Sequence, residues 1–164
     1  MFYDMRRTKQ LMSDEEAEAI LEEGTSGVLS LLGDNGYTYG VPLSYVKVGD
    51  RIYFHSAVNG HKLDAIRNHD RVSFTVIAED SVLPDMTSTK YRSVIVFGRV
   101  RLAETDEEKT QALTDLGKKI SPHRTEYLEG VIERKLKHTA VIILEIEHIT
   151  GKKAIEFFQK SKSE

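Results

Sequence analysis

Residues 52–62 read Ile-Tyr-Phe-His-Ser-Ala-Val-Asn-Gly-His-Lys, and their character changes twice along this stretch. They begin with β-favouring side chains and pass through small and turn-forming residues at positions 56–60. From His61 the chain enters an amphipathic segment in which the apolar Leu63 and Ile66 lie three positions apart. The stretch therefore predicts a strand, a short glycine-containing loop and the start of a helix.

A strand, a loop and a helix start in this order form a natural anion site. The first amides of a helix have no partner within it, and the helix dipole adds partial positive charge at the same end. Ser56 offers a hydroxyl group, Gly60 permits close approach of the backbone, and His61 and Lys62 supply donor or cationic side chains. We interpret the stretch as a cradle for the phosphate of a cofactor; the alternative is an ordinary connection whose Lys62 and His61 are solvated.

The composition is that of a globular protein without disulfides or thiolate chemistry. Of the 164 residues, 40% are hydrophobic and 30% are charged, and cysteine is absent. We expect a single domain spanning residues 1–164. The net charge of −3 gives no electrostatic footprint for nucleic acid.

The sequence also argues against a membrane protein. Residues 1–7 contain no apolar core of signal-peptide length, and the longest apolar run, at 140–144, has the length of a buried strand. We therefore expect a cytoplasmic protein without a membrane partner.

Outward from the central stretch, hydrophobic periodicity and turn residues divide the rest of the chain into helices and strands. Helices are expected at 13–23, with a capping box from Ser13 to Glu16, and at 62–68, 105–120 and 125–136. Strands are expected at 27–32, 37–48, 51–55, 72–77, 91–102 and 139–148, with a loop at 78–90 and a turn at 151–152. Six strands joined mostly by hairpins, with helices as lids, indicate a closed antiparallel barrel of the α+β class.

Pro42 marks a special point in the long extended segment. Proline cannot donate to a sheet ladder, so it indicates an edge, a bulge, or a place where a ligand replaces a neighbouring strand. The sequence leaves the simple bulge and the ligand site open.

Several familiar sites can be set aside. The chain has no dinucleotide-binding glycine motif, no phosphate loop and no nucleophile elbow. Its six histidines show no metal-ligand spacing, so no metal is expected.

Several motifs in order carry a resemblance to a known family. They are Gly27-Val28-Leu29-Ser30, Tyr39-Gly40-Val41-Pro42-Leu43-Ser44-Tyr45, Ile52-Tyr53-Phe54-His55-Ser56-Ala57, Gly60-His61-Lys62, Arg92-Ser93-Val94-Ile95-Val96-Phe97-Gly98 and Ile149-Thr150-Gly151-Lys152, with Met1-Phe2 and Met5-Arg6-Arg7 at the start. In this order the chain resembles the pyridoxamine-phosphate-oxidase-like split-barrel flavoproteins. More narrowly, it is similar to their 5-nitroimidazole-resistance branch.

The resemblance implies a six-stranded antiparallel split β-barrel with flanking helices, forming a homodimer with FMN in the dimer interface. It places Pro42, Leu43, Ser44 and Tyr45 at the flavin ring and ribityl chain, and His55, Ser56, Ala57, Gly60, His61 and Lys62 at the phosphate. Tyr91, Arg92 and Ser93 would contribute from the strand that lines the site, across the dimer or within one chain. Lys152 is a further candidate, whose alternative is a solvated side chain in an exposed turn.

The branch implies an FMN-dependent oxidoreductase that passes electrons from a small-molecule donor to a small nitroaromatic acceptor. His61 would donate a proton or orient substrate, or else serve the phosphate alone. The sequence lacks the C-terminal Arg/His constellation with which the true oxidases hold pyridoxamine phosphate, so oxidation of that substrate is not expected. The alternatives are a flavin-binding redox sensor or carrier without turnover, and a haem-binding split barrel.

Overall fold

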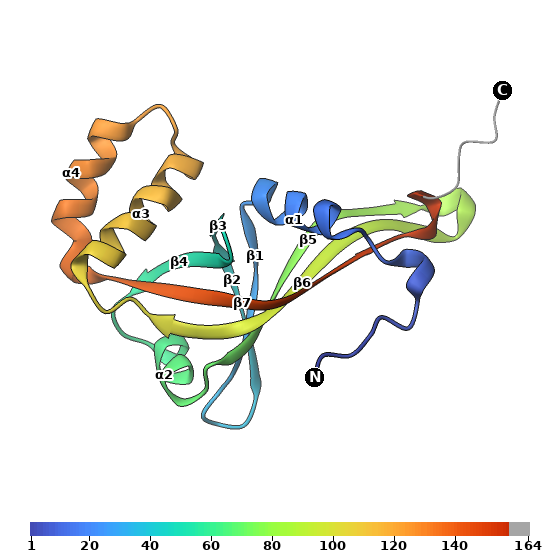
Figure 1. Ribbon diagram of the computed structural model, residues 1–164, viewed down its shortest axis with the longest axis horizontal. Helices are drawn as coiled ribbons and strands as arrows, with labels where there is room; N and C mark the ends of the chain where they lie inside the picture. The colour runs from blue at the N-terminus through green and yellow to red at the C-terminus, as the bar shows by residue number, and fades with distance from the viewer. Residues whose placement is uncertain (158–164) are drawn as a thin grey trace.

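The fold is built on one antiparallel sheet of seven strands that curls into a split barrel (Figure 1). The structure is a computed structural model and describes residues 1–157, except the side chains of residues 125 and 126. The strand order is β2-β1-β5-β6-β7-β4-β3, and β2 curls round far enough to contact β4. The predicted α+β class with an antiparallel split barrel is confirmed, with one strand more than expected.

The elements alternate along the chain as the sequence predicted. The strands are β1 (Ser26–Leu32), β2 (Thr38–Ser44), β3 (Val46–Val48), β4 (Arg51–Ala57), β5 (Arg71–Leu83), β6 (Ser88–Leu102) and β7 (Thr139–Lys153). The helices are α1 (Asp14–Glu23), α2 (His61–Asn68), α3 (Asp106–Ile120) and α4 (Thr125–Lys135), with short 3-10 turns η1 (Thr8–Gln10), η2 (Pro84–Met86), η3 (Leu136–His138) and η4 (Ile155–Phe157). The predicted domain of residues 1–164 includes residues 158–164, which lie outside the described residues.

The extra strand arises where the chain bends at Tyr45. The segment expected as one strand at 37–48 is divided into β2 and β3, because the Tyr45 side chain is fully buried between them. Its hydroxyl donates to the carbonyl of Leu21, 2.8 Å away, and its ring meets Phe74 edge-on. The buried Tyr45 therefore divides the extended segment 37–48 into the two strands β2 and β3.

Two expectations about loops are wrong. The segment 78–90 is not a loop, because β5 and β6 continue through it as a long hairpin that pairs Asp80 with Tyr91 and Leu83 with Ser88 around η2. Likewise Gly151 and Lys152 do not form a turn but belong to β7, paired with β6. In Figure 1 the hairpin of β5 and β6 forms the arm at the right of the molecule.

The sheet buries apolar side chains on both of its faces. The larger core fills the barrel and is covered by α1 and α2, with Leu21, Phe54, Leu63 and Phe74 among its fully buried members. The smaller core lies on the outer face of β3, β4 and β7, where α3 contributes Ala112 and Leu116. Since successive strand residues point to opposite faces, β4 takes part in both cores.

A glycine permits the close approach of β6 and β7. The register between them shifts after Phe97, and a Cβ atom at Gly98 would overlap the carbonyl oxygen of Glu145. Gly98 therefore allows the irregularity in pairing at this position, because it has no Cβ atom.

None of the helices within residues 1–157 has the length and apolar character that spanning a membrane requires.

Candidate functional site

The segment predicted as a phosphate cradle lies where β4 leads into α2. Gly60 stands immediately before the helix with φ at +128°, a conformation that favours glycine. Its carbonyl accepts from the amides of Leu63 at 2.9 Å and Asp64 at 3.3 Å. The amides of His61 and Lys62 come before these and have no carbonyl to bond within the helix, so they are available to an anion.

Lys62 is the cation of this cradle. Its side chain is half-buried, and within residues 1–157 no oxygen atom accepts a hydrogen bond or ion pair from its ammonium group. Burial lowers the pKa of Lys62 below its usual value. A partly desolvated ammonium group without a counter-ion is the arrangement that an anionic ligand would complete.

His61 lies between the cradle and the hairpin that joins β1 to β2. Its imidazole stacks on the Tyr39 ring, with centroids 4.5 Å apart and planes 13° apart. Its Nε2 lies 3.1 Å from Oδ1 of Asp34. With Nε2 directed at the carboxylate, Nδ1 is the nitrogen left to donate to or accept from a ligand.

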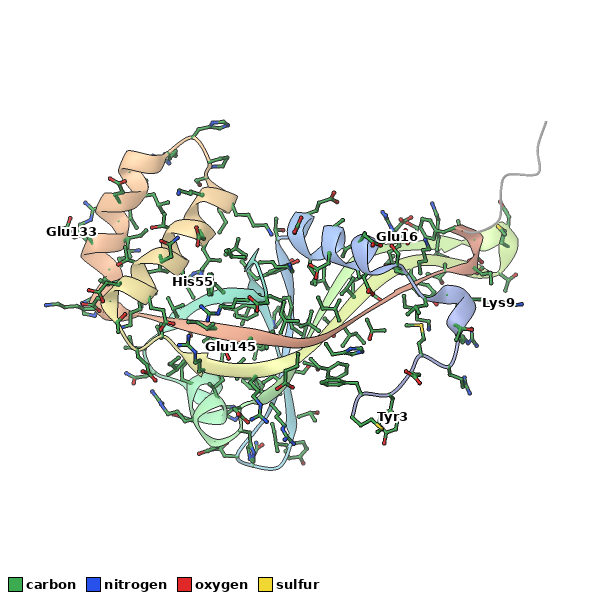
Figure 2. The ribbon with its side chains drawn as sticks, viewed as in Figure 1. Tyr3, Lys9, Glu16, His55, Glu133 and Glu145 are labelled. Carbon is green, nitrogen blue, oxygen red and sulfur yellow. The ribbon has the colours of Figure 1, made fainter. Side chains whose placement is uncertain are left out.

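Ser56 and His55 lie on opposite faces of β4. Ser56 shares the face of Phe54, which belongs to the same core as the apolar residues of α2. His55 shares the face of Tyr53 and lines a cavity beside α3 and α4 (Figure 2). The structure therefore brings Ser56 to the side of α2 and separates His55 from it, while Ala57 follows on the His55 face, exposed.

The strand expected at the flavin ring is the last strand at one end of the sheet. Pro42 and Ser44 are exposed on β2, whereas Leu43 packs partly against the larger core. An end strand presents backbone N–H and C=O groups that no neighbouring strand takes up, so β2 offers an edge for a polar ring. β2 also contacts β4, and Tyr39 of β2 touches His61, so this edge adjoins the cradle.

Tyr45, predicted beside these residues, has its side chain in the core. Burial raises the pKa of its hydroxyl, which is bonded to Leu21, and the ammonium group of Lys119 lies 4.6 Å from its ring centroid. Its amide donates to the Thr25 carbonyl at 3.1 Å. Within one chain Tyr45 supports the end of β2 rather than presenting a side chain at the edge.

The remaining predicted residues form a second group on β6 and β7. Ser93 pairs with Lys152, and the Lys152 ammonium group lies 5.4 Å from the centroid of the Tyr91 ring. Arg92 donates to Glu79 at 3.2 Å and lies over the ring of Phe157, 5.3 Å from its centroid.

This second group is remote from α2 in the same chain. Ser56, at the cradle end of β4, pairs with Ala140 of β7. Lys152 is twelve residues further along β7, which corresponds to about 40 Å of strand. The predicted site is thus divided between two places in the chain.

Sequence reasoning missed two residues that contact His61, Asp34 and Tyr39. Asp34 belongs to the Gly-Asp-Asn-Gly sequence at 33–36, which signals a turn, and nothing in its spacing indicates that the turn meets His61. Alternation along β2 would place Tyr39 on the face of Leu43, but the contact with His61 needs the curl of the sheet.

Metal ligation is not supported by the arrangement of side chains. Among residues 1–157 no three His, Cys, Asp or Glu side chains come together as metal ligands.

Solved structures with this fold are numerous. A 5-nitroimidazole antibiotic resistance protein candidate from Bacteroides thetaiotaomicron is 21% identical, with a TM-score of 0.73 over 87% of this chain and 85% of that one. The flavocytochrome Anf3 from Azotobacter vinelandii is 24% identical, with a TM-score of 0.80 over 93% and 72% of the two chains. An FAD-binding protein from Mesorhizobium loti is 25% identical, with a TM-score of 0.65 over 88% and 97%.

The comparison of sequences gives the family. No curated protein matches the chain significantly. The family model for pyridoxamine 5'-phosphate oxidase matches residues 13–153, which is most of the chain. The protein therefore belongs to the pyridoxamine 5'-phosphate oxidase family.

Proposed function

We propose that this protein binds FMN and acts as an oxidoreductase that reduces a small nitroaromatic acceptor. The observation that carries the proposal is the half-buried ammonium group of Lys62, which has no counter-ion among the described residues and stands in the first turn of α2. The neighbouring edge strand β2 supplies the second requirement, a surface for a flat polar ring.

The cradle fits a single phosphate group. Lys62, the Ser56 hydroxyl and the first amides of α2 would donate to its oxygens, and Gly60 leaves room for close approach. Charge-assisted hydrogen bonds contribute about 1.5–3 kcal/mol each, so three or four of them with ring burial reach micromolar affinity, about 8 kcal/mol. The flavocytochrome and the FAD-binding protein among the similar structures support a flavin in this fold.

The edge of β2 would hold the ring. Its backbone groups around Pro42 and Ser44 can bond the polar edge of an isoalloxazine, and the missing N–H of Pro42 suits a position where no strand follows. We assign Leu43 to the wall behind the ring, because it packs against the barrel core.

When bound, FMN would supply the redox chemistry, accepting electrons from a nicotinamide nucleotide and passing them to the acceptor. His61 would hold the proton that the acceptor needs, at Nδ1, since Nε2 is directed at Asp34. Tyr39 limits the rotation of the imidazole by stacking on it.

The second group of predicted residues would complete the site from a partner chain. Tyr91, Arg92, Ser93 and Lys152 lie on β6 and β7 beside the arm formed by β5 and β6, too far from the start of α2 to meet it within one chain. In a homodimer, the arm of one subunit would bring these donors to the flavin held by the other. Lys152 would be the cation available there to favour an anionic reduced ring, with Arg92, which is paired with Glu79, beside it.

Cofactor binding is tested with the purified protein. We expect a flavin absorbance spectrum and a released cofactor of the mass of FMN; a haem spectrum, or FAD as the released species, contradicts the assignment. For apoprotein, the double variant Ser56→Ala/Lys62→Ala should weaken FMN binding by one to three orders of magnitude.

Riboflavin, which lacks the phosphate, is the matched ligand, and its affinity should not respond to the double variant. Lys118→Ala is the control protein, because Lys118 is an exposed lysine of α3 outside the cradle. Equal losses for riboflavin and FMN would mean that the phosphate lies elsewhere.

Electron transfer is tested under anaerobic conditions. We expect NADH or NADPH to bleach the flavin in stopped flow, and a 5-nitroimidazole to restore its colour with formation of the reduced product. A bound flavin that stays oxidised with both donors would overturn the oxidoreductase proposal. The protein would then be a flavin-binding module without turnover.

A further inference from the structure

We propose that a cavity between the α3–α4 hairpin and the end of β4 is a second binding site, for a small aromatic or branched aliphatic carboxylate. The cavity has a volume of about 250 Å³ and lies on the His55 face of β4, opposite Ser56 and the cradle. The inference does not depend on the flavin, since none of the cradle residues around α2 lines this space.

The walls of the cavity are apolar. Leu116 and Ile120 of α3 face Leu128, Val131 and Ile132 of α4 across it. An apolar cavity of about 150 Å³ is enough to hold benzene. The larger volume here leaves room for one ring, or a branched chain of similar size, together with a carboxylate group.

The two helices touch at one side of this space. At Gly117 they are in contact, because a Cβ atom there would overlap the side chain of Leu128. Ile120, one turn further along α3, is 60% exposed although it lines the cavity. The apolar walls therefore remain open to a ligand beside the contact.

The polar end of the cavity carries one cation, the exposed side chain of Lys135. His55, Lys135 and Thr139 line it, and the Thr139 hydroxyl donates to the Lys135 carbonyl at 3.0 Å. No carboxylate lies within ion-pair distance of His55 or Lys135 among the described side chains. These two side chains are thus the donors available to a ligand, and an anionic group matches them.

Other cavities in the described chain do not share this combination. One is lined by Asp14, Glu18 and Glu147, whose carboxylates disfavour an anion. Another, beside Asp50, contains Glu145 and Glu147 together with arginines already paired to carboxylates. Apolar walls with an unpaired positive end are found between α3 and α4.

The test uses benzoate and benzamide as a matched pair of probes, titrated into the full-length protein. Methyl NMR of Leu, Val and Ile residues reports where each probe binds. We expect benzoate to shift the methyl signals of Leu116, Leu128 and Val131, and benzamide to bind at least tenfold more weakly. Lys135→Gln should weaken benzoate binding about tenfold, the loss expected for one charge-assisted hydrogen bond.

Two further variants separate the site from indirect effects. Val131→Trp should fill the cavity and remove benzoate binding while the methyl spectrum of the barrel is retained. Arg134→Gln, an exposed residue in the same last turn of α4 that does not line the cavity, should leave the affinity unchanged. Equal binding of benzamide, shifts centred on Leu43 of β2, or full affinity in Lys135→Gln would overturn the proposal.

Discussion

At the scale of single residues, Lys62 shows how function and stability oppose each other. Burial lowers its pKa, so the folded protein holds the charged form less readily than the unfolded chain does. Such a residue destabilises the protein, and groups with shifted pKa values are common at binding sites.

We therefore predict that Lys62→Met raises the stability of the flavin-free protein while weakening FMN binding. At neutral pH the gain should be about 0.5 kcal/mol or more, because the variant removes a partly desolvated charge. The unfolded chain binds the lysine proton more tightly, so wild-type stability recovers as the pH rises from the lowered pKa towards the ordinary value of about 10.4, and the gain should shrink there. Urea unfolding at several pH values measures it.

Lys118→Met serves as the comparison, since Lys118 is exposed and lies in the last turn of α3. The stability of Lys118→Met relative to wild type should not change as the pH rises. A Lys62→Met protein that is less stable than wild type at neutral pH would show that the ammonium group already has a stabilising partner.

The local structure around the proposed cradle was predictable, because it depends on residues that are close in sequence. Ser56, Gly60 and Lys62 follow from the order strand, loop, helix. Alternation along β4 also separates His55 from Ser56, although the motif as a whole suggested one group. Asp34 was out of reach, because its contact with His61 depends on how two distant segments meet.

At the scale of elements, helix ends were predicted well and strand ends poorly. The capping box at α1 is present as expected, with the Glu16 amide 3.2 Å from the Ser13 hydroxyl. The arm was missed because pairing between β5 and β6 stabilises residues 78–90, through cross-strand contacts such as that of Glu79 with Lys90 and Arg92. Such pairs lie far apart in sequence, and the periodicity of one strand does not reveal them.

The α3–α4 hairpin gives a prediction that compares two glycines in neighbouring helices. Gly130→Ala should stabilise the protein by about 0.5–1 kcal/mol, because alanine is the better helix former and its Cβ meets no atom within 4 Å. Gly117→Ala gains the same propensity but drives a methyl group into Leu128, at a cost of about 1–3 kcal/mol. Thermal unfolding and urea unfolding should rank the two variants in this order.

The comparison isolates the contact between the helices from helix propensity, since both changes are identical in chemistry. The variant Gly117→Ala/Leu128→Ala tests the cause, because shortening Leu128 removes the overlap. If Gly117→Ala stabilises the protein as much as Gly130→Ala, the helices do not pack through this contact.

At the scale of the whole molecule, the predicted site residues fall into two separate groups in one chain. An apolar strip on the outer face of the sheet offers a surface through which a second chain could bring the two groups together. Ile95 and Phe97 alternate with the buried Val94 and Val96 along β6, and both are exposed. Phe2 covers part of the strip by stacking on His148, with ring centroids 4.7 Å apart. A strip of this kind, beside donors that lack a ligand in their own chain, is what a twofold dimer with shared sites would use.

The double variant Ile95→Glu/Phe97→Glu should therefore lose dimerisation and flavin affinity together. Charged side chains cannot be buried in an apolar interface without large cost, so sedimentation should show monomers, and FMN affinity should fall at least tenfold. Val48→Glu is the matched control, because Val48 on β3 is 41% exposed against 39% for Ile95 and 38% for Phe97 but lies on another strand. Urea unfolding should show that all the proteins remain folded.

If FMN stabilises the dimer through a shared site, adding FMN must shift the association of the wild-type protein to lower protein concentration. Tight binding of FMN by a monomeric wild type would instead place the whole site in one chain, with the arm serving another purpose.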